Sequence, residues 1–258
     1  MHILCLNIGN THIYGGVFIN EDLQLNFRYP SKNACTSDQL GLFLKAVLRE
    51  NKVDAAKISG ISMASVAPSL NYSVTAACIK YFNVTPLILK PGIKTGLKLH
   101  VKNPLEVGAD RIANAVAATE HFPNKHVIVI DFGTATTLSV IAKDKEYLGG
   151  AIMPGLKVAM DSLHKSTEKL SPINIIHPKV VLGKTTEENI QSGLYYSQLG
   201  AIKEILEHLK HEVIFTQPPA VIATGGYAHL FEQEKVFTVV IPDLVLQGLR
   251  ILFEKNRT

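Results

Sequence analysis

Two short stretches of the sequence combine glycine with small polar residues directly after an apolar run. The first reads LNIGNTHIYGG at residues 6–16, and the second reads VIVIDFGTATTLSVI at residues 127–141. In each, a polar residue (Asn7 or Asp131) is followed by one apolar residue and a glycine. The backbone N–H groups of such a turn can converge on an anion, and glycine lets a ligand approach closely. The pair therefore predicts phosphate-binding turns, with a plain β-hairpin as the alternative for either turn alone.

Asp131 follows Asn7 by 124 residues, close to half the length of the 258-residue chain. Similar segments at the heads of two equal halves predict an internal duplication. The two copies differ in charge, because the amide of Asn7 stands where the second copy has the carboxylate of Asp131. A carboxylate at a strand end without a basic neighbour in sequence predicts a cation ligand, and turn initiation by aspartate is the alternative.

A third candidate lies in the sequence NPLEVGADRIANA at residues 103–115. Asn-Pro predicts the start of a helix, and adjacent side chains on a helix diverge, so we expect Asp110 and Arg111 to serve different partners. The carboxylate could accept the proton of a substrate hydroxyl, while the guanidinium holds a phosphate or a carboxylate. Two solvated charges on a helix surface are the alternative.

A fourth candidate is the Gly225-Gly226 pair, which follows the strand-like run VIAT at residues 221–224. Two glycines after a strand let a flat ring or a phosphate approach the backbone. A simple turn into a short helix explains the pair equally well.

The elements that must position these residues follow one order in both halves. Strands that arrive as a meander and then alternate with helices predict mixed sheets covered by helices, an α/β class. In the first half, we predict strands at 2–7, 12–18, 23–28, 58–66 and 86–90, and helices at 36–50 and 70–82. In the second half, we predict strands at 126–131, 134–142, 146–153 and 220–224, and helices at 155–166, 186–210 and 241–254. An alanine-rich helix at 104–121 would join the halves, which gives expected domains at 1–115 and 116–258 around a shared cleft.

The composition limits the partners of the chain. It is 47% hydrophobic and 19% charged, its formal net charge is +4, and no run of Lys or Arg exceeds two residues. Binding of nucleic acid or of a membrane surface therefore has little electrostatic support. Cys5, Cys35 and Cys78 lack metal-ligand spacing and are typical of buried side chains in a reducing compartment. With neither a secretory signal nor an apolar run of about 18 residues, we expect a cytoplasmic protein.

Taken together, the motifs resemble those of the type III pantothenate kinases. The resemblance runs nearly end to end, and its specificity lies in the order and spacing of many short motifs. It implies the duplicated actin-like ATPase (ribonuclease H-like) fold, with two mixed-sheet domains flanking a nucleotide cleft. It also implies ATP-dependent phosphorylation of pantothenate to 4'-phosphopantothenate, the first step of coenzyme A biosynthesis. The motifs are Asn7–Thr11, Gly108–Arg111, Asp131–Thr137, Gly149–Leu156, Thr167–Leu170, Gly183–Thr186 and Gln191–Gly193.

The resemblance also implies roles for single positions. Asp110 matches the general base on the pantothenate hydroxyl, and Asp131 matches the ligand of a monovalent cation, K⁺ or NH₄⁺. ATP would bind with Mg²⁺, and the family's homodimers, in which the subunit interface completes the pantothenate site, imply a homodimer here. The substrate-binding positions are Val101, Gly108, Ala109, Asp110, Arg111 and Thr186. The ATP-binding positions are Asn7, Ile8, Gly9, Asn10, Thr11, His12, Ile13, Tyr14, Thr134, Gly225 and Gly226.

Two positions depart from the family pattern. The family's first loop begins with an aspartate that helps to hold hydrated Mg²⁺, and this sequence has Asn7. Val101 stands where the family commonly has an aromatic residue in contact with pantothenate. Three hypotheses therefore stay open: a pantothenate kinase, a catalytically weak homologue with a nucleotide- or pantothenate-binding regulatory role, and an actin-like kinase for another small hydroxylated acid. The presence of Asp110, Arg111, Asp131, Thr134 and Thr186 favours catalysis over the regulatory role.

Overall fold

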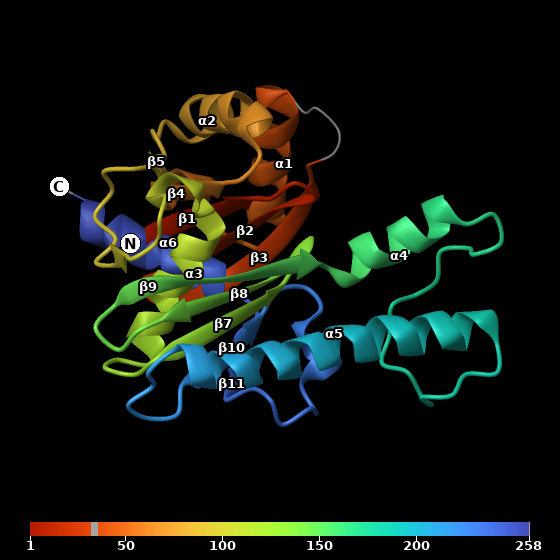
Figure 1. The fold of residues 1–258 in the computed structure, drawn as a ribbon. Helices are drawn as coiled ribbons and strands as arrows, with labels where there is room; N and C mark the ends of the chain where they lie inside the picture. The colour runs from red at the N-terminus through yellow and green to blue at the C-terminus, as the bar shows by residue number, and fades with distance from the viewer. Residues whose placement is uncertain (32–35, 258) are drawn as a thin grey trace. The chain divides into compact units, whose positions relative to one another are not determined.

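The structure is a computed structural model, and it describes residues 1–31 and 36–257. Contacts within the chain divide it into two compact units, each with its own sheet (Figure 1). The first unit is Met1–Glu120 together with Leu244–Thr258, and the second is His121–Asp243.

The first unit is built on a mixed sheet with the strand order β3-β2-β1-β4-β5. The first three strands form an antiparallel meander, and β4 and β5 continue the sheet in parallel with β1. The strands are β1 (His2–Ile8), β2 (His12–Ile19), β3 (Asp22–Pro30), β4 (Ile58–Ser65), β5 (Leu87–Ile88) and the short β6 (Lys98–Leu99), which is not part of this five-stranded sheet. The helices are α1 (Ser37–Glu50), α2 (Pro68–Phe82), α3 (Ala109–His121) and α6 (Leu244–Asn256), with 3₁₀ turns at η1 (Ala55–Lys57) and η2 (Pro104–Glu106).

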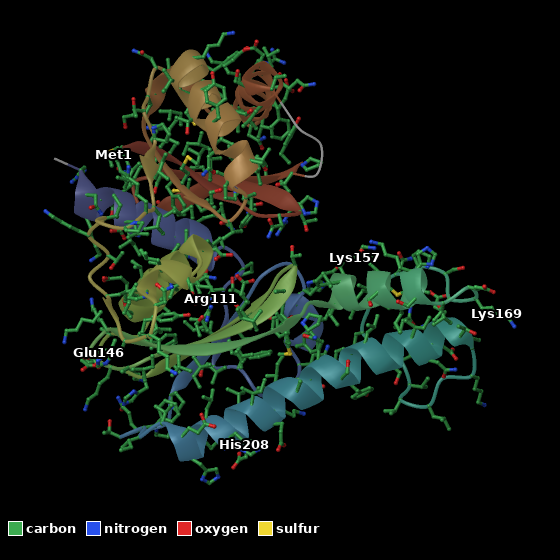
Figure 2. The ribbon with its side chains drawn as sticks, turned by 45° about the horizontal axis from the view of Figure 1, so that its top comes forward. Met1, Arg111, Glu146, Lys157, Lys169 and His208 are labelled. Atoms are coloured by element: carbon green, nitrogen blue, oxygen red, sulfur yellow. The ribbon has the colours of Figure 1, made fainter. Side chains whose placement is uncertain are left out.

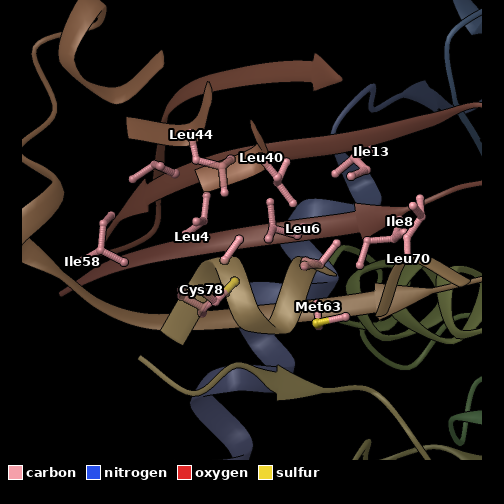
Figure 3. Close-up of a cluster of buried hydrophobic side chains, with 14 of the residues drawn as sticks. Leu4, Leu6, Ile8, Ile13, Leu40, Leu44, Ile58, Met63, Leu70 and Cys78 are labelled. Carbon is pink, nitrogen blue, oxygen red and sulfur yellow. The ribbon is translucent and has the colours of Figure 1, made fainter. Parts of the chain in front are cut away.

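Alternation along β1 sorts its side chains between two helical layers. Leu4, Leu6 and Ile8 belong to a buried cluster with residues of α1 and α2 (Figure 3). Ile3 and Cys5 belong to a second cluster with residues of α3 and α6. Because successive side chains of a strand point to opposite faces, Asn7 lies on the face that α3 covers.

The second unit repeats this arrangement. Its strands follow the order β9-β8-β7-β10-β11, with β7, β8 and β9 as the antiparallel meander and β10 and β11 parallel to β7. The strands are β7 (Val127–Phe132), β8 (Ala135–Ile141), β9 (Glu146–Pro154), β10 (Ala220–Thr224) and β11 (Val239–Val240). The helices are α4 (Leu156–Ser166) and α5 (Thr186–Glu212), with a 3₁₀ turn at η3 (Ala228–Phe231).

The strand registers support the predicted duplication. Asn7 pairs with Tyr14 across the first hairpin, and Asp131 pairs with Thr137 across the second. Asn7 and Asp131 therefore occupy equivalent places, each on the strand that joins the meander to the parallel part of its sheet. The first turn is one residue longer, because β2 begins at His12 while β8 begins directly after the turn at residues 133–134.

Most predicted elements are confirmed to within a few residues, and two differ in an informative way. The helix predicted at 104–121 is instead a 3₁₀ turn followed by α3. The last helix belongs to the first unit, whereas the predicted division assigned it to a domain at 116–258. A Cβ atom at Gly248 of α6 would lie 1.9 Å from the carbonyl oxygen of Ala113, so only glycine permits the close crossing of α6 and α3.

Two expectations from composition can be compared with the described residues. Cys5 and Cys78 are buried free thiols, as predicted, while Cys35 lies outside the described residues. In residues 1–31 and 36–257, no helix combines the length and the apolar character needed to cross a membrane.

Candidate active site

The first glycine turn is closed by its own backbone. The N–H of Gly9 donates to the carbonyl oxygen of His12 at 3.1 Å. A Cβ atom at Gly9 would lie 2.9 Å from that same oxygen, so a larger residue would push the turn open. At the start of the turn, Oδ1 of Asn7 is buried and has no hydrogen-bond partner among the described residues. Since buried polar atoms are nearly always paired, this oxygen is an acceptor that fits a donor such as metal-bound water.

Asp110 lies near the end of β1 within the same unit. The N–H of Val66, just after β4, donates to the carbonyl oxygen of Ile8 at 2.9 Å. A Cβ atom at Gly108 would lie 3.7 Å from Cγ1 of Val66 and 2.6 Å from Oδ1 of Asp110. Thus Gly108, one of the predicted substrate-binding residues, leaves room for the Asp110 carboxylate beside the strand ends that carry the first turn.

The environment of Asp110 suits a base. The residue is in the first turn of α3 and is partly buried, and its Oδ1 accepts a 2.8 Å hydrogen bond from the N–H of Arg111. Burial raises the pKa of Asp110, and the hydrogen bond and the positive charge of Arg111 offset only part of this effect. A carboxylate with a raised pKa holds a proton more strongly, which improves its function as a general base.

The second turn brings two predicted residues together that are far apart in sequence. Thr224 at the end of β10 pairs with Asp131 of β7, so Gly225 follows at the same edge. A Cβ atom at Gly225 would lie 2.4 Å from Oδ1 of Asp131, and its φ of +92° also favours glycine. On the other side, a Cβ atom at Gly133 would lie 3.5 Å from the same oxygen. The Asp131 carboxylate is therefore held between two glycines, whereas the neighbouring Gly226 has open space around it.

The start of α4 is attached to the second turn. The N–H of Gly155 donates to the carbonyl oxygen of Thr134 at 3.1 Å. A Cβ atom at Gly155 would lie 2.4 Å from the carbonyl oxygen of Gly133, so this contact requires glycine. The motif at residues 149–156 thus joins β9 and α4 to the turn that contains Thr134.

Sequence reasoning missed an aromatic stack behind Asp131. The ring of Phe132 stacks on Phe231 with the centroids 4.7 Å apart, and Phe231 stacks on Tyr195 of α5 at 4.8 Å. The hydroxyl of Tyr195 donates to Oε1 of Glu234 at 2.9 Å. The stack connects the strand that carries Asp131 to the long helix α5, and only the aromatic character of these positions could have indicated it.

Thr186 is an exposed residue of the second unit, at the first position of α5. The hydroxyl oxygen of Thr185 caps this helix by accepting the N–H of Glu188 at 3.2 Å. Thr186 also lines a mostly apolar cavity of about 720 Å³ between α4 and α5. In Figure 2, Lys157 marks the start of α4 and His208 lies toward the far end of α5. Val101 is partly buried in the irregular segment between β6 and η2 of the first unit.

Metal binding was predicted through Asp131 and through the first turn. Within the part of the chain that the structure describes, three or more His, Cys, Asp or Glu side chains nowhere gather as a metal site. A cation at either turn would therefore depend on few protein side chains. Such a site suits hydrated Mg²⁺, which keeps several water ligands, or a monovalent cation bound mainly by carbonyl and ligand oxygens.

Solved structures with low sequence identity share the fold. One is a conserved Campylobacter jejuni protein assigned to the Baf family of transcriptional activators, with a TM-score of 0.62, 17% identity and 98% of both chains covered. Another is an inorganic polyphosphate/ATP-glucomannokinase from Arthrobacter, with a TM-score of 0.50, 13% identity and 99% of both chains covered. At these identities the likeness concerns the fold alone, and it assigns the chain to the duplicated fold of actin-like ATPases and sugar kinases.

The sequence comparisons identify the family. Residues 3–208 match the type III pantothenate kinase family. The chain is 54% identical over 255 residues to type III pantothenate kinase 1 of Francisella tularensis subsp. holarctica, covering 99% of this chain and 100% of the relative. It is 51% identical over 254 residues to the type III pantothenate kinase of Legionella pneumophila, covering 98% and 99%. The chain belongs to the type III pantothenate kinase family.

Proposed function

We propose that the chain transfers the γ-phosphoryl group of ATP to pantothenate, which gives 4'-phosphopantothenate for coenzyme A biosynthesis. The observation that carries the proposal is the partly buried Asp110 with a raised pKa, beside the strand ends that hold the first glycine turn. Asp110 removes the proton from the pantothenate hydroxyl, and Arg111 holds the pantothenate carboxylate. Phosphoryl transfer depends mainly on positioning and on neutralising charge, so the protein needs little covalent chemistry.

Each glycine turn has its own proposed contacts with the nucleotide or its cations. Backbone N–H groups of residues 9–11 and the hydroxyl of Thr134 hold the ATP phosphates, and Gly225-Gly226 admits the adenosine. Mg²⁺, when bound, would neutralise phosphate charge, and Oδ1 of Asn7 would accept a hydrogen bond from a water molecule of the metal's hydration shell. The buried Oδ1, which lacks a hydrogen-bond partner among the described residues, supports this role. Asp131, held between two glycines, binds K⁺ or NH₄⁺.

We further propose that the protein is a cytoplasmic homodimer with α5 at its interface. Gly193 and Gly200 lie two turns apart on the exposed face of α5, and a Cβ atom at either would have open space within 4 Å. Glycine within a helix costs about 1 kcal/mol relative to alanine, and no described neighbour requires it here. Val158 and Leu163 of α4 line the adjoining cavity and are each 40% exposed. A second copy packed on α5 accounts for both features and would complete the pantothenate site near Thr186.

Steady-state kinetics test the activity. We expect ADP formation by the purified protein to require pantothenate, Mg²⁺ and K⁺ together. The Asp110→Asn variant should lose at least about 10²-fold in kcat, in line with the removal of a general base. Equal rates for the native protein and Asp110→Asn would contradict the role of Asp110.

Light scattering coupled to gel filtration tests the dimer. The native protein should elute with twice the chain mass of 28.2 kDa. Gly193→Lys should elute as a monomer, although lysine favours the helix more than glycine does. Lys210→Glu, an exposed change near the far end of α5, is the matched control and should stay dimeric. A monomeric native protein would refute this part of the proposal.

A further inference from the structure

A row of three side chains crosses the first sheet beside the first glycine turn. Asn7 of β1 pairs with Tyr14 of β2, and Tyr14 pairs with Arg28 of β3. Residues directly opposite each other on antiparallel strands point to the same face of a sheet. All three side chains therefore lie on the face that α3 covers, the face of the first unit that also carries Asp110.

Arg28 reaches from the third strand toward the first. Its guanidinium carbon lies 4.5 Å from the centroid of the Tyr14 ring, over the middle residue of the row. Arg28 is exposed, and among the described residues no carboxylate forms an ion pair with it. Its orientation therefore comes from the aromatic ring, because a cation is attracted to the face of such a ring.

The end of β3 is tied to the phosphate turn. The N–H of Ser31 donates to the carbonyl oxygen of Thr11 at 2.9 Å, and His12 pairs with Pro30. Arg28 is only two residues before this connection. Arg28 therefore lies near the end of β3 that is hydrogen-bonded to the turn at residues 9–11.

The neutral side chain of Asn7 leaves this cation uncompensated. A carboxylate at that position would stand next to Tyr14 in the row and would attract the guanidinium. With asparagine, the row carries one positive charge and no negative charge. The equivalent row of the second unit consists of Asp131, Thr137 and Ile152 and has no cation, so the arrangement belongs to the first unit alone.

We propose that Arg28 binds the polyphosphate of ATP at the first turn and that Tyr14 positions Arg28 for this contact. Guanidinium groups bind phosphate oxygens through paired, charge-assisted hydrogen bonds, and such contacts are among the strongest that a side chain makes. Arg28 then supplies attraction for phosphate at a turn that lacks the usual metal-binding charge. The inference rests on the proposed function for the identity of the phosphate donor.

Equilibrium binding of ATP and of adenosine to the purified protein tests the inference, once with Mg²⁺ and once with EDTA. Arg28→Gln should weaken ATP binding about tenfold or more under both conditions and leave adenosine binding unchanged. Arg28→Lys should recover part of the loss, because lysine keeps the charge without the planar fork. Arg49→Gln, an exposed arginine of α1, is the matched control and should bind both ligands like the native protein.

Two further variants test the positioning by Tyr14. Tyr14→Phe keeps the ring and should lose less ATP affinity than Tyr14→Leu, which should weaken ATP binding to a similar extent as Arg28→Gln. Unchanged ATP binding by Arg28→Gln, equal losses for ATP and adenosine, or no ATP binding by the native protein would each overturn the inference. No pantothenate is present in these measurements. A protein that binds ATP through Arg28 but does not phosphorylate pantothenate would therefore refute the proposed function and leave this inference standing.

Discussion

Replacing Asn7 with aspartate adds one negative charge at the end of β1 with almost no change in shape. The oxygen that would carry the charge is buried and lacks a hydrogen-bond partner among the described residues. In the absence of metal, no described residue donates a hydrogen bond to this oxygen, and a buried polar group without a hydrogen bond costs about 1–3 kcal/mol, more when it is charged. Attraction by Arg28 across the row would offset only part of this cost. We therefore expect Asn7→Asp to lower the free energy of unfolding in EDTA.

The same charge should strengthen the response to Mg²⁺. A hydrogen bond from metal-bound water to an anionic oxygen contributes about 1.5–3 kcal/mol, against about 0.5–1.5 kcal/mol for a neutral oxygen. The difference of about 1–1.5 kcal/mol corresponds to roughly five- to tenfold in apparent affinity. The Mg²⁺ concentration for half-maximal rate should fall by about that factor, and Mg²⁺ with ATP should restore much of the lost stability.

Two assays on Asn7→Asp and on a control variant test the expected changes in Mg²⁺ response and in stability. Initial rates are measured against Mg²⁺ at saturating ATP and pantothenate, and unfolding by urea is measured with EDTA and with Mg²⁺-ATP. Asn26→Asp adds the same charge at an exposed position of β3 and should change neither result. If Asn7→Asp leaves the Mg²⁺ response unchanged, Asn7 does not face the metal, and the reasoning from its orphan oxygen is wrong.

Three further predictions concern groups whose environment the structure defines. Asp110→Asn should abolish most turnover. The free energy of unfolding at pH 7.5 should stay unchanged or rise, because burial raises the pKa of Asp110 and disfavours its ionised form. Kinetics and urea unfolding of one preparation check both expectations. Gly225→Ala should lower the free energy of urea unfolding by about 1–3 kcal/mol, because the new Cβ would lie 2.4 Å from Oδ1 of Asp131 at a φ of +92°. It should also weaken activation by K⁺. Gly226→Ala should not affect stability, since a Cβ atom there has open space. Burial and the charge of Lys143 lower the pKa of His126, so the unfolded chain takes up the proton first. The free energy of unfolding should therefore decrease as pH falls below about 6.5, and His126→Gln should reduce this decrease in urea titrations at pH 7.5 and 5.5.

The strands and turns of the site could be predicted because their signals are local. The alternation along β1 and the glycines after β1 and β7 are visible within about ten residues of sequence. The helix signals were also local: Thr36 and Gln39 form the capping box at the predicted start of α1. Similar local signals in both halves were enough to predict the duplication.

Contacts between distant segments could not be predicted in the same way. The pattern of the last helix shows which of its faces is apolar but not which sheet it covers, and its place in the first unit depends on the close approach of Gly248 to Ala113. Likewise, nothing near Gly225 indicates that its backbone will lie against Asp131. Arg28 is a single charged residue in an alternating strand, and only the strand register shows that it reaches over Tyr14.

The central claim is that this chain, with asparagine at position 7, is a working pantothenate kinase. Mass spectrometry of a reaction containing the native protein, ATP, Mg²⁺, K⁺ and pantothenate tests it most directly. We expect equal molar amounts of ADP and 4'-phosphopantothenate, and at least about 10²-fold slower formation of both when Asp110→Asn replaces the native protein. Absence of 4'-phosphopantothenate from the native reaction, together with its formation by Asn7→Asp, would contradict the claim.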